Sequence, residues 1–163
     1  MKKSKKQNII IVAIAIIIIG TIAGYNYSVD QTKQKGLKFG NELQQIQEEV
    51  KQLQTEFNSK ITQWEEEDLS QQELSEYSKN HIEKLQNVIL KYDDLIPPKQ
   101  FASSVELFKL STQAQLDSDK EFIEWIKTSD DSHKIRSDSL LQESFEYEMM
   151  ALGEFNAAKS GLR

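Results

Sequence analysis

The chain has 163 residues, no cysteine and a formal net charge of −6. Its length suits one domain plus an anchor, and the missing cysteine excludes a disulfide framework, a thiolate zinc site and a cysteine nucleophile. Four lysines precede an apolar run, and the rest of the chain holds 16 basic residues against 26 acidic ones. Because so acidic a surface repels phosphate groups, composition argues against nucleic-acid binding.

The first predicted element is an apolar helix. Residues 9–22 read IIIVAIAIIIIGTI, and no charged side chain occurs between Lys6 and Asp30. A helix needs about 20 predominantly apolar residues to cross a bilayer. We therefore predict a single transmembrane helix over residues 8–27 that acts as a signal anchor.

The flanks of this helix predict its orientation. A basic tail at residues 1–7 favours the cytoplasmic side, and two tyrosines suit the far membrane interface. These flanking anchors are Lys2, Lys3, Lys5, Lys6, Tyr25 and Tyr27. A cleaved signal peptide has a similar basic start and apolar core, although Thr21-Ile22-Ala23 is a poor cleavage site. Both readings place residues 28–163 outside the cytoplasm, and the anchor reading, which we prefer, places the protein at the cell membrane with a single crossing.

A Gly-x-x-x-Gly pair, Gly20 and Gly24, lies at the end of the apolar run. Such a pair lets two helix backbones approach closely in a bilayer. It is compatible with packing against another membrane protein or against a second copy of the chain. The alternative is that glycine is simply common in spanning helices.

The remainder of the chain predicts helices. No glycine occurs between Asn41 and Leu152, and the only two prolines are adjacent. Strands and turns need such residues, whereas helices avoid them. We expect four helices with short connections, which pack as an antiparallel up-down four-helix bundle. Their predicted ranges are 34–65, 70–94, 98–127 and 132–160.

Apolar stripes and capping signals support these ranges. Six apolar residues of the first helix recur in steps of four and three, which is a heptad pattern. They are Phe39, Leu43, Ile46, Val50, Leu53 and Phe57. A parallel coiled-coil dimer through this seam is the rival architecture. Ser70 and Glu73 form a capping box at the start of the second helix, and Pro98 suits the first turn of the third.

The last two helices carry the widest apolar faces. The third has a broad face that includes Leu110, which predicts that it is the most buried helix. The fourth is predicted to place five residues toward the core. They are Leu141, Phe145, Met149, Leu152 and Phe155.

The corner between the second and third predicted helices reads LIPPKQF, from Leu95 to Phe101. It resembles the Pro-Pro-x-x-Phe helix corner of small membrane-anchored, extracytoplasmic helical-bundle proteins of prokaryotes. That group is largely uncharacterised. The resemblance implies an anchored all-helical domain and carries over no functional residue.

Candidate metal and catalytic residues do not form a known motif. His81 lacks the Glu-x-x-His spacing of a di-iron bundle, because residue 78 is serine. His133 follows Asp130 by three residues at a loop edge. Residues 117–121 imitate the start of a calcium loop, but Phe122 stands where that loop needs glycine. We therefore assign no catalytic, metal or cofactor-binding residue, and expect a protein that is not an enzyme.

The function that remains is binding. We expect a non-enzymatic, membrane-anchored extracytoplasmic module that binds another membrane or envelope protein, as an accessory or structural subunit of a membrane complex. The alternative is an extracytoplasmic ligand-sensing four-helix bundle that acts through a separate signalling partner.

Overall fold

The computed structural model describes residues 33–161, with side chains from Lys38 onward. Within this range the chain forms four α-helices and one 3₁₀ turn, and no strand. The helices are α2 (Lys33–Glu65), α3 (Gln71–Asp93), α4 (Ala102–Thr128) and α5 (Asp131–Lys159), and the turn η1 is Lys99–Phe101. The prediction of an all-helical domain is therefore confirmed.

The predicted transmembrane helix, residues 8–27, lies outside the described residues. None of the helices within residues 33–161 is both long enough and apolar enough to cross a bilayer. The anchor thus stays a prediction from the sequence.

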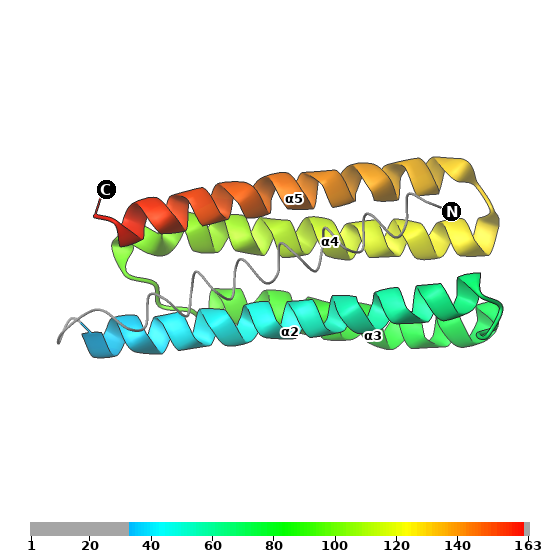
Figure 1. Ribbon diagram of the computed structural model, residues 1–163, viewed down its shortest axis with the longest axis horizontal. Helices are drawn as coiled ribbons and strands as arrows, with labels where there is room; N and C mark the ends of the chain where they lie inside the picture. The colour runs from blue at the N-terminus through cyan, green and yellow to red at the C-terminus, as the bar shows by residue number, and fades with distance from the viewer. Residues whose placement is uncertain (1–32, 162–163) are drawn as a thin grey trace.

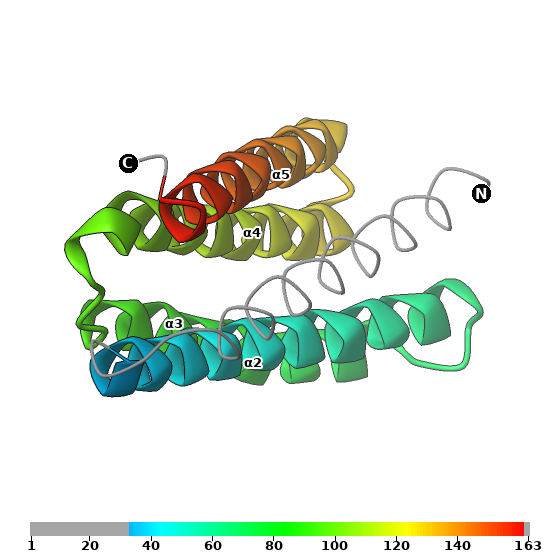
Figure 2. The ribbon, with the colours of Figure 1, turned by 60° about the vertical axis from the view of Figure 1, so that its left-hand side comes forward.

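The four helices form two antiparallel hairpins that pack on each other. One layer holds α2 and α3, and the other holds α4 and α5 (Figures 1 and 2). The start of α2, the α3–α4 connection and the end of α5 lie at one end of the bundle (Figure 1). The α2–α3 and α4–α5 loops lie at the opposite end, which we call the tip.

The α2–α3 hairpin follows the predicted pattern. Phe39, Leu43 and Phe57 of the heptad seam are almost completely buried. The capping box of α3 is present: the Glu73 backbone N–H donates to the Ser70 hydroxyl at 3.3 Å, and the Ser70 N–H donates to the Glu73 carboxylate at 2.9 Å. These two bonds satisfy backbone N–H groups at the start of α3, which have no acceptor within the helix.

The proline corner differs from its prediction. Pro98 was expected in the first turn of a helix over 98–127, but its ψ of 144° is extended and α4 begins only at Ala102, after η1. The detour turns Phe101 into the core, where its ring lies 5.6 Å from Phe39 and 5.0 Å from Phe155. Phe101 therefore joins both hairpins at this end of the bundle.

The α4–α5 pair is joined by a seam of small residues spaced seven apart. Ser111 donates to the Ser144 carbonyl and Ser144 donates to the Ser111 carbonyl, both at 2.9 Å. One heptad along, the Ser118 hydroxyl donates to the Ser137 carbonyl at 2.8 Å. Ser104 on α4 and Ala151 on α5 continue the same spacing, and both are completely buried. Small side chains let the two backbones approach closely enough for a hydroxyl to reach the opposite carbonyl.

Two side chains that were predicted for the core are exposed, and the seam explains the one on α5. Met149 was expected to face the core but is 59% exposed, and Leu110 is 37% exposed. The line through Ser137, Ser144 and Ala151 occupies the side of α5 that contacts α4. The helix is therefore rotated so that Leu152 and Phe155 are buried, as predicted, while Met149 points outward.

Candidate functional site

Polar side chains form two layers inside the bundle, one heptad apart. The first layer contains Gln47, Tyr92 and Thr112, and the second contains Gln54, His81 and Asp119. Each layer draws one residue from α2, one from α3 and one from α4, and all six are buried. Buried polar groups cost folding free energy unless they are hydrogen-bonded, so their partners decide what these layers can do.

The second layer is centred on the Asp119 carboxylate. Its Oδ2 atom accepts a hydrogen bond from the Gln54 amide at 2.7 Å and contacts His81 Nε2 at 2.9 Å. The His81 ring is stacked on Phe57, with ring centroids 4.2 Å apart. His81 is 1% exposed, so Asp119 and Phe57 fix the position of an imidazole that water does not reach.

The other ring nitrogen of His81 faces away from Asp119. Nδ1 is buried and has no hydrogen-bond partner among the described residues. The polar contact of the His81 ring with the Asp119 carboxylate therefore runs through Nε2 alone.

A pocket of about 110 Å³ lies beside this layer, between α2, α4 and α5. Asp119 and Gln54 form part of its wall, together with the apolar side chains of Phe57, Ile61 and Leu141. Asp119 Oδ1 has no hydrogen-bond partner within residues 33–161, whereas Oδ2 is occupied by two donors. The pocket thus combines apolar walls with one fixed carboxylate.

The Asp119–His81 pair resembles part of a catalytic triad, but no hydroxyl of residues 38–161 is hydrogen-bonded to its outer nitrogen. In a triad, the imidazole nitrogen that faces away from the carboxylate takes a proton from a hydroxyl or thiol. Here that nitrogen is Nδ1, which has no partner among the described residues. The nearest serine in the helix, Ser78, donates instead to the Leu74 carbonyl at 2.6 Å.

In the first layer, each side chain donates a hydrogen bond to the next group. Gln47 donates to the Tyr92 hydroxyl at 2.7 Å, Tyr92 lies 3.0 Å from the Thr112 hydroxyl, and Thr112 donates to the Phe108 carbonyl at 3.0 Å. Since Thr112 uses its own proton, the Tyr92 O–H donates to Thr112. Burial raises the pKa of Tyr92, and the Glu148 charge raises it further.

Glu148 is a carboxyl group whose pKa is strongly shifted. Desolvation raises the pKa of Glu148 from 4.5 to about 7, with no compensating donor. The folded protein therefore holds this proton more tightly than the unfolded chain, and the ionised form weakens the fold. Stability conferred by the protonated form is complete below pH 4.5 and is lost as pH rises through 7.

This shift predicts the behaviour of Glu148→Gln. At pH 8 the variant should be more stable than the parent by about 1–2 kcal/mol, because it removes a desolvated charge from a partly exposed site. At pH 5 the two proteins should be nearly equal. Chemical denaturation followed by circular dichroism at both pH values measures the difference. Glu146→Gln, on an exposed position of α5, is the control. Equal pH profiles for the two variants would contradict the assignment.

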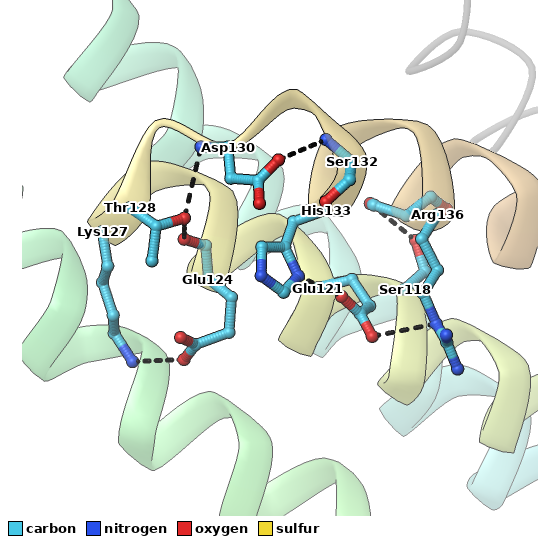
Figure 3. A network of polar contacts seen from close by, with 10 residues as sticks. Ser118, Glu121, Glu124, Lys127, Thr128, Asp130, Ser132, His133 and Arg136 are labelled. Carbon is cyan, nitrogen blue, oxygen red and sulfur yellow. Dashed lines mark hydrogen bonds and ion pairs between the residues drawn. The ribbon is translucent and has the colours of Figure 1, made fainter.

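A second polar network lies at the tip (Figure 3). Glu121 of α4 accepts from His133 Nδ1 at 2.6 Å and from Arg136 Nε at 3.0 Å, both on α5. The hydrogen bond to Glu121 raises the pKa of His133. Asp130 is the N-cap of α5, and its carboxylate accepts from the Ser132 N–H at 2.9 Å. The network thus ties α4 to α5 and caps a helix.

The residues tested for metal binding from sequence are used elsewhere. Asp117 pairs with Lys120, Asp119 with His81, and Glu121 with His133. No three His, Asp or Glu side chains of residues 33–161 are gathered in a metal-binding arrangement. The other predicted site residues lie outside the described part of the chain. They are Gly20, Gly24, Lys2, Lys3, Lys5, Lys6, Tyr25 and Tyr27.

Sequence reasoning missed Gln54, and it considered Asp119 only as part of the calcium-loop-like run 117–121 rather than as a buried residue. A signal was present, because Gln47 and Gln54 on α2 and Thr112 and Asp119 on α4 are polar residues seven apart within apolar stripes. Read as positions of a heptad, they would have indicated buried polar layers. The register of α4 against α3, which brings Asp119 to His81, could not be predicted from the sequence.

Comparison of the chain with protein-family models, with curated proteins and with solved structures found no match. The resemblance through the Pro-Pro-x-x-Phe corner therefore stays an expectation from the sequence.

Proposed function

We propose that this protein is a non-enzymatic, membrane-anchored module that binds a partner membrane or envelope protein outside the cytoplasm. The observation that carries this proposal is the position of Ile96. Its side chain is 84% exposed, more than any other large apolar side chain in residues 38–161. It lies in the α3–α4 connection, at the end of the bundle where α2 begins (Figure 1).

The predicted anchor determines which way the end of the bundle with Ile96 would face. The apolar run at residues 9–22 precedes α2, so the end of the bundle that carries Ile96 would face the membrane. Pro97 and Pro98 follow Ile96 and restrict its backbone. An exposed apolar side chain on a restricted backbone suits contact with another protein close to the bilayer. The tip, with its ion-paired and acidic side chains, would face away.

Site-specific photocrosslinking tests the proposal. A photoreactive amino acid at Ile96 should form a discrete protein adduct in native membranes, and mass spectrometry of that adduct identifies the partner. The same probe at Ile135 is the matched control, because this isoleucine is 70% exposed and lies near the tip. Adducts with lipid only, or equal adducts from both positions, would contradict partner binding at this end.

Labelling tests the topology separately. The chain has no cysteine, so Ile135→Cys provides a single thiol at the tip. A membrane-impermeant maleimide should label this variant in intact cells. Labelling only after the cells are broken would place the bundle on the cytoplasmic side and would rule out the proposed orientation.

A ligand-sensing bundle is the second candidate function. The pocket beside Asp119 favours it, because bundles bind small molecules between helices with few convergent polar groups. Any ligand that binds only the folded state raises the melting temperature of the bundle. A sensor of this kind would act through a separate signalling partner. The crosslinking experiment would identify that partner as well.

A further inference from the structure

We infer that the pocket between α2, α4 and α5 binds a small organic ammonium ion through the Asp119 carboxylate. This site is independent of the partner-binding end of the bundle, because it lies toward the tip. Three features of the described residues carry the inference: the fixed acceptor, the charge of the lining and the apolar walls.

The acceptor is oriented before a ligand arrives. Gln54 and His81 both engage Asp119 Oδ2, at 2.7 Å and 2.9 Å, and leave Oδ1 on a side chain that lines the pocket. The Gln54 amide is an uncharged donor, so its hydrogen bond does not neutralise the carboxylate. A positively charged donor would stabilise a largely buried carboxylate that has a free oxygen. Such charge-assisted hydrogen bonds are stronger than hydrogen bonds between neutral groups.

The lining is acidic overall. Glu65, Asp119 and Asp138 contribute carboxylates, and Lys134 is the only basic side chain among the lining residues. Lys134 already pairs with Asp138, one turn along α5. It is therefore engaged by another carboxylate rather than by Asp119, and the remaining charge of the pocket attracts a cation.

The walls limit the size and the kind of cation. Phe57, Ile61 and Leu141 present apolar surface, which disfavours a hydrated metal ion and suits an alkyl chain. An apolar cavity of about 150 Å³ accommodates benzene. A pocket of about 110 Å³ therefore suits an alkylammonium of a few carbon atoms.

The test uses the full-length protein in mild detergent, with n-butylammonium as the probe and n-butanol as its neutral counterpart. Ligand-detected NMR should show saturable binding of n-butylammonium and binding of n-butanol weaker by about tenfold. Asp119→Asn keeps the shape of the side chain and should weaken n-butylammonium binding by about tenfold or more. Asp117→Asn is the control, because it removes one charge from the same helix at a position that does not line the pocket.

A second variant tests the contribution of the pocket volume to binding separately from that of the Asp119 charge. Leu141→Trp retains Asp119 but fills the pocket, so it should abolish binding while the protein stays folded by circular dichroism. Lack of saturable n-butylammonium binding by the folded parent protein would overturn the inference. Equal affinity for n-butanol, or undiminished binding by folded Asp119→Asn or Leu141→Trp, would overturn it too. None of these results depends on a partner protein, so they leave the crosslinking test of the proposed function intact.

Discussion

Asp119→Ala is expected to destabilise the bundle by about 2–4 kcal/mol. The substitution removes the acceptor shared by Gln54 and His81, and both donors then remain in the core without a partner. An unsatisfied buried donor costs roughly 1–3 kcal/mol, and water from the adjacent pocket would recover part of that cost. Chemical denaturation of the full-length protein, followed by circular dichroism, measures the change.

The control for this prediction is Asp117→Ala. Asp117 is two residues away on the same helix and pairs with Lys120, but both side chains are about 40% exposed. Its loss should change stability by less than about 1 kcal/mol, because exposed ion pairs contribute little. A similar loss in both variants would mean that the buried layer has no special energetic role.

A combined replacement tests the mechanism. If unpaired donors cause the loss, replacing the whole layer should cost less than replacing Asp119 alone. The triple variant Gln54→Leu, His81→Phe and Asp119→Leu removes acceptor and donors together. Exchanging a buried polar cluster for apolar side chains of similar volume is often neutral or stabilising. A triple variant less stable than Asp119→Ala would show that packing, rather than hydrogen bonding, dominates at this layer.

The sequence predicted the elements of the bundle well because their signals are local. The capping box at Ser70 and the proline pair at the corner act within a few residues, and both mark helix ends in the structure. The heptad seam of α2 is also a local pattern, and its Phe39, Leu43 and Phe57 are buried. Local rules of this kind determine where helices begin and end.

The pairing between helices was harder to predict because it depends on register and rotation. Met149 fits the apolar stripe of α5 by spacing, yet it is exposed, since the small-residue seam sets the rotation of that helix. Serines spaced seven apart on α4 and α5 read as polar surface when only hydrophobicity is considered. In the same way, the sequence does not distinguish Asp119 from the other acidic residues of this acidic chain. Its role follows from the register of α4 against α3, which brings it to His81.

Ser111 lies in the small-residue seam between α4 and α5, where it exchanges hydrogen bonds with Ser144. Ser111→Leu is expected to destabilise the fold by about 3 kcal/mol, because a large side chain cannot fit between two closely packed helices and the hydrogen bond to Ser144 is lost. Ser111→Ala keeps the small volume and should lose only about 1 kcal/mol. Denaturation curves of both variants give the difference between them.

The contrast between these two variants is the informative measurement. In a helix pair at ordinary spacing, a leucine at a buried heptad position would add apolar contact and stabilise the pair. At this seam it should do the opposite, whereas Ser103→Leu on an exposed position of α4 should have little effect. If Ser111→Leu were as stable as the parent, the two backbones could not be as close as the reciprocal bonds between Ser111 and Ser144 require. The rotation of α5 that exposes Met149 would then need a different cause.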